Sequence, residues 1–266
     1  MSDRYPQRIV CLTEEPTEVL YLLGEQARIV GISGFTVRPP QARREKPKVS
    51  AFLTAKTPEI IALKPDLVIG FSDLQADIAQ ILIRAGIEVW ISNHRSVEGI
   101  LGYIARLGAM VGAHQQTEKL LARIDAHLLA ISTQAAAFPR RPRVYFEEWD
   151  TPMMSAILWV AELVRIAGGD DVFPKLSLEP LGRGRIIADF ETVIAAQPDI
   201  ILGSWCGKKF RPEQVAARPG FAAIPAVKNG ALYEIKSPLI LQPGPAALLD
   251  GLSAMHAIFR NFAHAR

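Results

Sequence analysis

Short apolar runs alternate with helical stretches through the first part of the chain. Five runs, rich in β-branched residues, fall at 8–12, 28–33, 48–52, 66–71 and 88–92. Continuous apolar runs of this length are typical of strands buried on both faces of a parallel sheet. Between them, 17–23 and 76–85 carry apolar residues at helical spacing and stop at a glycine, the preferred residue after a helix. The pattern predicts βα units and a mainly parallel sheet.

The strand pattern stops between Ser96 and about Ala136. Apolar residues there fall largely at intervals of three and four, as on one face of a helix. We expect Gly108 and Gly112 to break this stretch, and a helix of about 20 residues from Gln116 would span about 30 Å. The loop at 138–142, FPRRP, is a boundary signal.

The βα pattern restarts after this loop, with strands predicted at 143–149, 199–205 and 231–235 and a helix at 156–167. The segment 59–70, EIIALKPDLVIG, nearly repeats at 192–203, TVIAAQPDIILG. Each copy predicts a helix, a Pro-Asp turn and a buried strand, which indicates a duplication. We therefore expect an α/β protein with two similar lobes, at 1–95 and 139–266, joined by a long interlobe helix at 96–138.

Composition and charge narrow the class of protein. Of the 266 residues, 49% are hydrophobic and 21% are charged, and the net charge is +3, values that are ordinary for a globular protein. So small a charge, with no Lys/Arg run interleaved with aromatics, argues against nucleic acid as a partner. No stretch of about 18 apolar residues is present to span a bilayer, so we expect no membrane insertion.

The N-terminus and the two cysteines bear on the compartment. Residues 1–8 lead into the first strand without the apolar core of a signal peptide. The chain as written is therefore expected to be cytoplasmic, or periplasmic if a signal precedes it. Cys11 and Cys206 form neither a disulfide framework nor a zinc motif, and each is expected to be a small buried hydrophobe.

Several stretches together resemble one protein family over the whole length. They are RIVCL at 8–12 with TEVL at 17–20, VGIS at 30–33, and above all ALKPDLV at 62–68. These stretches resemble the substrate-binding proteins of ABC importers in the cluster with a rigid interlobe helix, whose members bind cobalamin, ferric siderophores, haem or metal ions. The spacing is most similar to the cobalamin-binding members. The resemblance implies two Rossmann-like lobes bridged by a helix, with a shallow cleft between them.

The resemblance also implies a partner, an ABC permease. Family members carry one surface glutamate per lobe, seven residues before the Pro-Asp pair, which meets arginines of the permease. Glu191 has that spacing from Pro198, whereas Glu59 is one residue closer to Pro65. The alternative is that both are helix-start carboxylates, which the helix dipole favours.

Candidate ligand contacts in the first lobe follow from the strand ends, because ligands of open α/β sheets bind beyond the carboxyl ends of the strands. Phe35, Phe52 and Phe71 each lie at a different strand end. By resemblance they occupy positions where cobalamin binders place aromatic residues against the corrin. Three exposed rings would form an apolar platform for a large flat ligand, whereas the alternative is that each ring caps the core under a loop. Arg38 follows the same strand end as Phe35, Glu15 follows the end of the first strand, and both are further candidates.

The second lobe supplies a mixed set of candidates at its strand ends and in neighbouring loops. Trp149 and Trp205 are expected to face the phenylalanines. Two acidic pairs, Glu14-Glu15 and Glu147-Glu148, could receive a cationic or amide-bearing ligand, pair with Arg183, Arg185 or Lys208, or place one member in solvent and the other at a helix cap. The full set is Glu147, Glu148, Trp149, Arg185, Trp205, Lys208, Phe210, Ile240 and Gln242.

Signals for metal binding and catalysis are weak. A divalent metal needs three or four converging ligands, and His94 alone among the five histidines sits at a predicted strand end, so no metal site or cofactor is expected. No P-loop, H-E-x-x-H, G-x-S-x-G or C-x-x-C motif is present, and we expect no enzyme. A hydrolase or isomerase that uses the carboxylate pairs is the catalytic alternative.

The predicted function is capture of a bulky small molecule, such as cobalamin (vitamin B12) or another corrinoid, in the interlobe cleft. The chain would serve as the binding component of an ABC importer. One alternative is a binder of a ferric siderophore or another metal chelate. Another is a cytoplasmic ligand-binding protein or chaperone of the same fold without a permease.

Overall fold

The computed structural model describes residues 4–265. These residues form two compact units. The first comprises the residues up to His94 together with Glu98–Ile124, and the second comprises Arg95–Val97 together with the residues from Asp125 onward. Each unit is described by itself.

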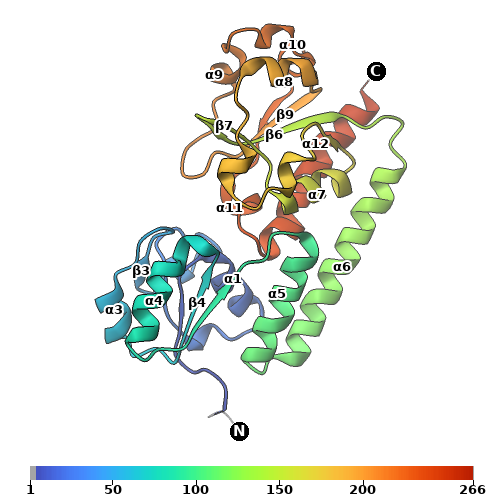
Figure 1. Cartoon of the computed structure of the whole chain (residues 1–266). Helices are drawn as coiled ribbons and strands as arrows, with labels where there is room; N and C mark the ends of the chain where they lie inside the picture. Colours follow the sequence, from blue (N-terminus) through green and yellow to red (C-terminus); the bar gives the residue numbers. More distant parts are fainter. Residues whose placement is uncertain (1–3, 266) are drawn as a thin grey trace. The chain divides into compact units, whose positions relative to one another are not determined.

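The first unit is built on a five-stranded sheet in the order β3-β2-β1-β4-β5, and every neighbouring pair is parallel. Nearly all residues of the three middle strands are buried, as their continuous apolar runs predict. Helices α3 and α4 lie side by side (Figure 1). The strands are β1 (Ile9–Cys11), β2 (Ile29–Ser33), β3 (Lys48–Ser50), β4 (Leu67–Phe71) and β5 (Val89–Ser92), and the helices before the long helical stretch are α1 (Glu14–Leu22), α2 (Ala42–Glu45), α3 (Thr57–Ala62) and α4 (Ala76–Arg84).

Helix α1 begins earlier than its predicted start at Thr17. Thr13 is the residue before the helix, so Glu14, Glu15 and Pro16 form the first turn. A proline is tolerated there because the first N–H groups of a helix have no acceptor within the helix.

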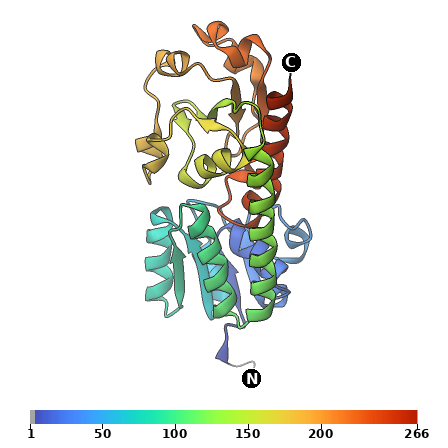
Figure 2. The same ribbon diagram turned by 90° about the vertical axis from the view of Figure 1, so that its right-hand side faces the viewer.

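The long helical stretch consists of two helices, α5 (Val97–Met110) and α6 (His114–Ala136). The break confirms the prediction from the glycines: Gly112 has φ +73, a conformation that favours glycine. Gly108 of α5 lies directly against the side chain of Thr117. Helix α6 has 23 residues and runs without interruption (Figure 2), and the division between the two units falls within it, after Ile124.

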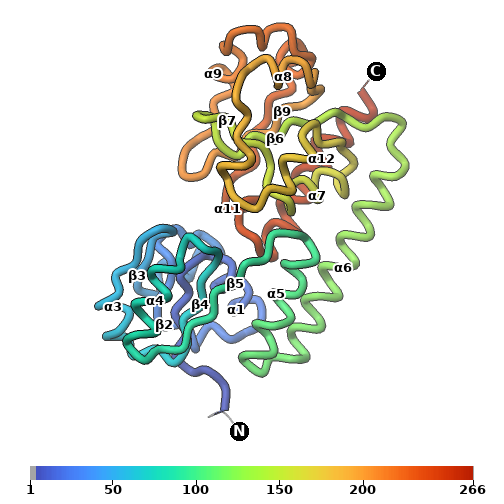
Figure 3. The backbone as a smooth tube through the Cα atoms, in the orientation of Figure 1, coloured from blue at the N-terminus to red at the C-terminus, as the bar shows by residue number. Residues whose placement is uncertain are grey.

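The second unit contains a sheet in the order β10-β9-β6-β7, with the short β8 paired to β6. Figure 3 traces the backbone through β6, β7 and β9. All pairs are parallel except β6 with β7, a hairpin that the apolar pattern did not predict. The strands are β6 (Arg143–Asp150), β7 (Met153–Ser155), β8 (Asp170–Asp171), β9 (Ile200–Gly203) and β10 (Leu232–Glu234), and the helices are α7 (Leu158–Ala167), α8 (Phe190–Ala196), α9 (Pro212–Ala216), α10 (Pro225–Lys228), α11 (Ser237–Ile240) and α12 (Leu252–His264), with a π-helical turn at Ala247–Gly251.

The Pro-Asp segment of the first unit holds the start of β1. Lys64 has φ +49, and this left-handed residue ends α3. The carboxylate of Asp66 accepts the backbone N–H of Arg8 at 2.9 Å, and the Arg8 guanidinium donates to the carbonyl of Leu63 at 2.6 Å.

The second copy of the repeat makes the same contacts in the second unit. Gln197 has φ +42, Asp199 accepts the backbone N–H of Arg143 at 2.9 Å, and the Arg143 guanidinium donates to the carbonyl of Ala196 at 2.8 Å. The near-repeat in sequence is thus a repeat in backbone geometry and hydrogen bonding.

Candidate functional site

The loops after the strands of the first unit expose several large apolar side chains. Strand order reverses at β1, and ligands of such sheets bind beyond the carboxyl ends near this point. Phe35, which follows β2, is 55% exposed, and Val37, Leu53 and Leu74 in neighbouring strand-end loops are also exposed. Phe52 is half-buried. These three aliphatic residues were not among the predicted ligand contacts, although each is an apolar residue close to a strand end.

Phe71 departs from the expected wall of three exposed rings. It is the last residue of β4 and only 5% exposed, because β4 is an inner strand covered on both faces. Its ring lies edge-on to His94, with centroids 5.2 Å apart. His94 is itself buried and shares a hydrogen bond of 2.7 Å with Ser92. The expectation of exposure was therefore wrong for Phe71.

The charged candidates of the first unit are buried or paired with other side chains of the same unit. Glu14 and Glu15 are both buried in the first turn of α1, so for this pair the alternative of one member in solvent was wrong. The Thr13 hydroxyl donates to Glu15 at 2.6 Å. Burial raises the pKa of Glu15 to about 8 despite this bond, so the group is largely neutral at pH 7. Arg38 pairs with Glu18 at 2.9 Å.

In the second unit, Glu147 is fully buried and accepts hydrogen bonds from three other side chains. Arg218 donates to both of its carboxylate oxygens, at 2.5 and 2.9 Å. The Tyr145 hydroxyl and the Trp205 indole N–H also donate to Glu147, at 3.0 and 2.9 Å. Glu147 and Trp205, both expected at the ligand surface, are therefore core residues. Arg218 was missed, because nothing local in the sequence links it to β6.

Glu148 confirms one alternative raised for the acidic pairs. It forms an ion pair with Arg185, whose two terminal nitrogens lie 2.5 and 3.1 Å from the carboxylate oxygens. Arg185 also donates to the carbonyl of Ser155 at 2.7 Å. This arginine is buried, so it supports the hairpin of β6 and β7, and its expected place at the ligand surface was wrong.

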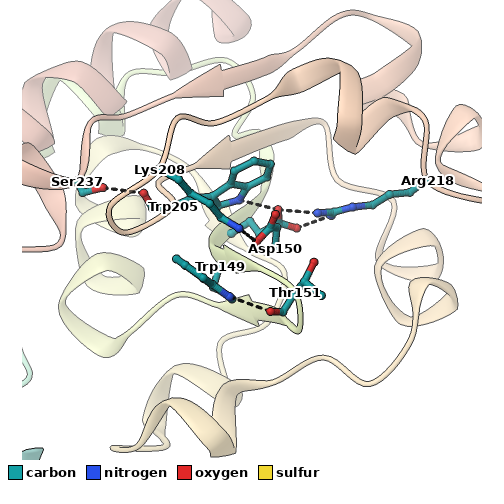
Figure 4. Close-up of polar contacts among 8 residues, drawn as sticks. Trp149, Asp150, Thr151, Trp205, Lys208, Arg218 and Ser237 are labelled. Atoms are coloured by element: carbon teal, nitrogen blue, oxygen red, sulfur yellow. Dashed lines mark hydrogen bonds and ion pairs between the residues drawn. The ribbon is translucent and has the colours of Figure 1, made fainter. Parts of the chain in front are cut away.

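Trp149, Asp150 and Lys208 form the accessible part of this region, here called the Lys208 cluster. The Lys208 ammonium lies 4.1 Å from the centroid of the Trp149 ring and pairs with Asp150. The Trp149 indole N–H donates to the carbonyl of Thr151 at 2.8 Å (Figure 4). Trp149 is half-buried and Lys208 is exposed. A flat aromatic surface thus stands beside an exposed cation.

The remaining candidates divide between core and surface. Phe210 and Ile240 are buried: the Phe210 ring fills the space beside Gly203, where the absence of a side chain lets it approach. Their expected exposure was wrong. Gln242 is half-buried. Cys11 is buried as expected, whereas Cys206 is exposed, because it lies in the turn that links β9 to the Lys208 cluster.

The two glutamates expected to meet a permease are both exposed, each in the first turn of a helix. Glu59 in α3 forms an ion pair of 3.1 Å with Lys56. Glu191 in α8 follows Asp189, which caps that helix by accepting the backbone N–H of Thr192 at 2.8 Å.

None of the helices within residues 4–265 is long and apolar enough to cross a membrane. The same residues contain no group of three or more His, Cys, Asp or Glu side chains placed to hold a metal ion.

Open α/β sheets bind ligands beyond the carboxyl ends of their strands, and apolar side chains there, as in the first unit, suit a small-molecule site. The family model described as periplasmic binding protein matches residues 9–239, and the chain belongs to this family. This confirms the resemblance found in the sequence.

Relatives match most of the chain at low identity. A vitamin B12-binding protein of Vibrio vulnificus is 25% identical and the match covers 91% of this chain and 86% of the relative. An uncharacterized ABC transporter substrate-binding lipoprotein, YvrC of Bacillus subtilis, is 24% identical, covering 94% and 79%. A cobalamin-binding protein of Halobacterium salinarum is 24% identical, covering 97% and 71%.

Solved structures show the same fold. The periplasmic haem-binding protein RhuT of Roseiflexus aligns with a TM-score of 0.82 at 24% identity, covering 97% of this chain and 99% of that one. The vitamin B12-binding protein BtuF of Vibrio cholerae aligns with a TM-score of 0.76 at 21% identity, covering 98% and 99%. The expectation of an α/β protein with mainly parallel sheets is confirmed.

Proposed function

We propose that this chain is the substrate-binding component of an ABC import system and that its ligand is a corrinoid. The observation that carries the proposal is the set of apolar side chains exposed beyond the strands of the first unit, Phe35, Leu53 and Leu74 among them. Large exposed apolar side chains gathered at a ligand-binding edge suit a bulky ligand with an apolar body. Relatives named for vitamin B12 or cobalamin, matched along nearly the whole chain, support the choice of ligand.

Binding without catalysis fits the state of the carboxylates. A general acid or base must reach the substrate with a suitable pKa. Glu147 is buried and held by Arg218, Glu148 is held by Arg185, and Glu15 is buried beneath the strand ends. The proposal therefore assigns these carboxylates to structure, and the family and the compared structures are of binding proteins.

Calorimetric titration of the purified chain with cyanocobalamin tests the proposal. We expect saturable binding of one corrinoid per chain, and haemin serves as the comparison ligand because compared structures of this fold include haem-binding proteins. If cyanocobalamin produces no heat at high micromolar protein, the corrinoid assignment is wrong. Saturable binding of haemin alone would indicate that the ligand is haem.

A variant pair locates the site. Phe35→Ala removes an exposed ring at a strand end, whereas Leu129→Ala removes an apolar side chain of α6 that is also more than half exposed. Loss of a well-buried aromatic contact weakens binding by about 2 kcal/mol, or some thirtyfold. We expect a loss of that order for the Phe35 variant and unchanged affinity for the Leu129 variant. Equal affinities of the two variants would place the ligand elsewhere.

A further inference from the structure

Three carboxylates follow one another closely at the end of β6, and each is paired with a cation from another segment. The pairs join Glu147 to Arg218, Glu148 to Arg185 and Asp150 to Lys208. Glu147 and Glu148, which the sequence offered as receptors for a cationic ligand, are thus already paired with cations of the protein.

The three pairs differ in how much they are shielded from water. The side chains of Arg218 and Arg185 are 11% and 3% exposed, whereas Lys208 is 40% exposed. Breaking a buried pair leaves a charge without a partner and costs about 3–5 kcal/mol, whereas an exposed pair contributes only about 0–1 kcal/mol. Lys208 is therefore the cation of the three that can exchange its carboxylate for an outside anion at little cost.

The surroundings of Lys208 hold its ammonium beside a flat aromatic surface. The ammonium lies 4.1 Å from the Trp149 centroid and 5.3 Å from that of Trp205 (Figure 4). Trp205 is fixed by its bond to Glu147, and its carbonyl accepts the Ser237 hydroxyl at 3.0 Å. An ammonium has three N–H donors, and Asp150 accepts one of them, so the charge is oriented by its neighbours while donors remain for another acceptor.

The backbone supports this position independently of the side chain. The N–H of Lys208 donates to the carbonyl of Trp205 at 3.3 Å, which closes a turn, and Gly207 within it has φ +77. Such a turn suits glycine and lets the lysine side chain move while its Cα stays in place.

We propose that Lys208 selects, among flat ligands, those that carry an anionic substituent such as a phosphodiester or a carboxylate. The substituent replaces Asp150 as the partner of the ammonium. This inference rests on the proposed function. It adds that the second unit recognises a negatively charged group of the ligand.

Two corrinoids, one with and one without the nucleotide loop that carries the phosphodiester, test the inference. Cyanocobalamin carries a phosphodiester in its nucleotide loop, whereas cobinamide has the same ring system without it. Lys208→Met keeps most of the apolar stem but removes the charge, and Asp150→Asn frees the ammonium from its internal partner. Lys209→Met is the matched control, because Lys209 is also exposed and lies in the same loop.

Calorimetric affinities are expected to separate the variants. A charge-assisted hydrogen bond at a partly exposed site is worth about 1.4 kcal/mol, a tenfold change in affinity. Lys208→Met should weaken cyanocobalamin about tenfold and cobinamide less than about twofold, Asp150→Asn should tighten cyanocobalamin alone, and the Lys209 control should change neither. Raising the salt concentration should weaken cyanocobalamin binding in the unsubstituted chain more than in Lys208→Met.

The outcomes distinguish this inference from the proposed function. If the unsubstituted chain binds both corrinoids and Lys208→Met weakens them equally or not at all, the inference fails while the corrinoid assignment stands. If neither corrinoid binds, the proposed function fails and the inference fails with it. Unchanged unfolding midpoints of the variants show that a selective loss does not come from misfolding.

Discussion

Arg218 donates to both carboxylate oxygens of Glu147, at 2.5 and 2.9 Å, although 71 residues separate them along the chain. Tyr145 and Trp205 donate to the same carboxylate. The pair therefore ties the loop after α9 to β6 and orients the indole behind the Lys208 cluster.

Removing one partner of this pair should be costly. Arg218→Met leaves the buried Glu147 carboxylate without its cation, and we expect a loss of about 3–5 kcal/mol in the free energy of unfolding. The double variant Glu147→Gln/Arg218→Met should recover part of that loss, because no net charge stays buried. Urea unfolding of the unsubstituted chain, the two single variants and the double variant measures both effects, and additive losses in the double variant would contradict the coupling.

Glu15 should make stability depend on pH. Burial raises its pKa from 4.5 to about 8 in the folded chain, so the folded state binds a proton more tightly than the unfolded state does. Its contribution to stability is full below about pH 4.5 and is lost as pH rises toward 8. Ionised Glu14 and Glu18 nearby add to the rise, while the Thr13 hydroxyl opposes it.

The test compares the unsubstituted chain with Glu15→Gln, which keeps the shape but cannot ionise. Between pH 6.5 and 8.5 the stability of the unsubstituted chain should fall relative to the variant, by at most about 1.4 kcal/mol per pH unit. Asp171, whose pKa burial raises to about 6, completes most of its titration below this window. Parallel stability curves for the two proteins would show that Glu15 does not titrate there.

The Pro-Asp segments offer a test of the structural repeat. Asp66→Ala and Asp199→Ala each remove the acceptor for the backbone N–H at the start of β1 or β6. We expect each to cost about 1–2 kcal/mol in the free energy of unfolding. Asp170→Ala removes a carboxylate from an exposed pair with Arg141 and should cost under about 1 kcal/mol. A cost for Asp66 or Asp199 no larger than for Asp170 would contradict the structural role.

Charge reversal at the helix starts tests the permease partner. Under the proposed function, Glu191→Arg should abolish corrinoid uptake by cells that carry the cognate transporter while leaving calorimetric affinity unchanged, because like charges repel at a docking contact. Glu59→Arg should act in the same way. Glu213→Arg, an exposed first-turn carboxylate of α9, is the control, and uptake equally reduced by all three substitutions would refute specific docking.

The elements of the fold were largely predictable from local patterns. The five strands of the first unit lie within the five apolar runs, and the break between α5 and α6 falls at Gly112. The repeated Pro-Asp segments appear as repeated hydrogen bonds. Strand burial, helix periodicity and glycine conformations are properties of residues close together in sequence, so the sequence alone determines them.

The lining of the candidate site was less predictable. Residues at strand ends were predicted as ligand contacts, yet Phe71, Phe210 and Ile240 are buried, whereas Leu53 and Leu74, which were not among the predicted contacts, are exposed. Being next to a strand end does not say which side of a loop a side chain occupies. Packing against neighbouring elements decides that, as the space beside Gly203 does for Phe210.

The sequence by itself therefore determined the class of protein, its parallel sheets and its internal repeat. Only the tertiary structure decided which charged side chains form ion pairs within the protein. Arg218 pairs with Glu147 over a separation of 71 residues, and Lys208 pairs with Asp150 over a separation of 58 residues. Ion pairs depend on distance in space and on exposure to water, and neither follows from position along the chain. The sequence predicted an acidic surface at the end of β6. In the structure its carboxylates are paired with Arg218, Arg185 and Lys208, and Lys208 is the most exposed of these three cations.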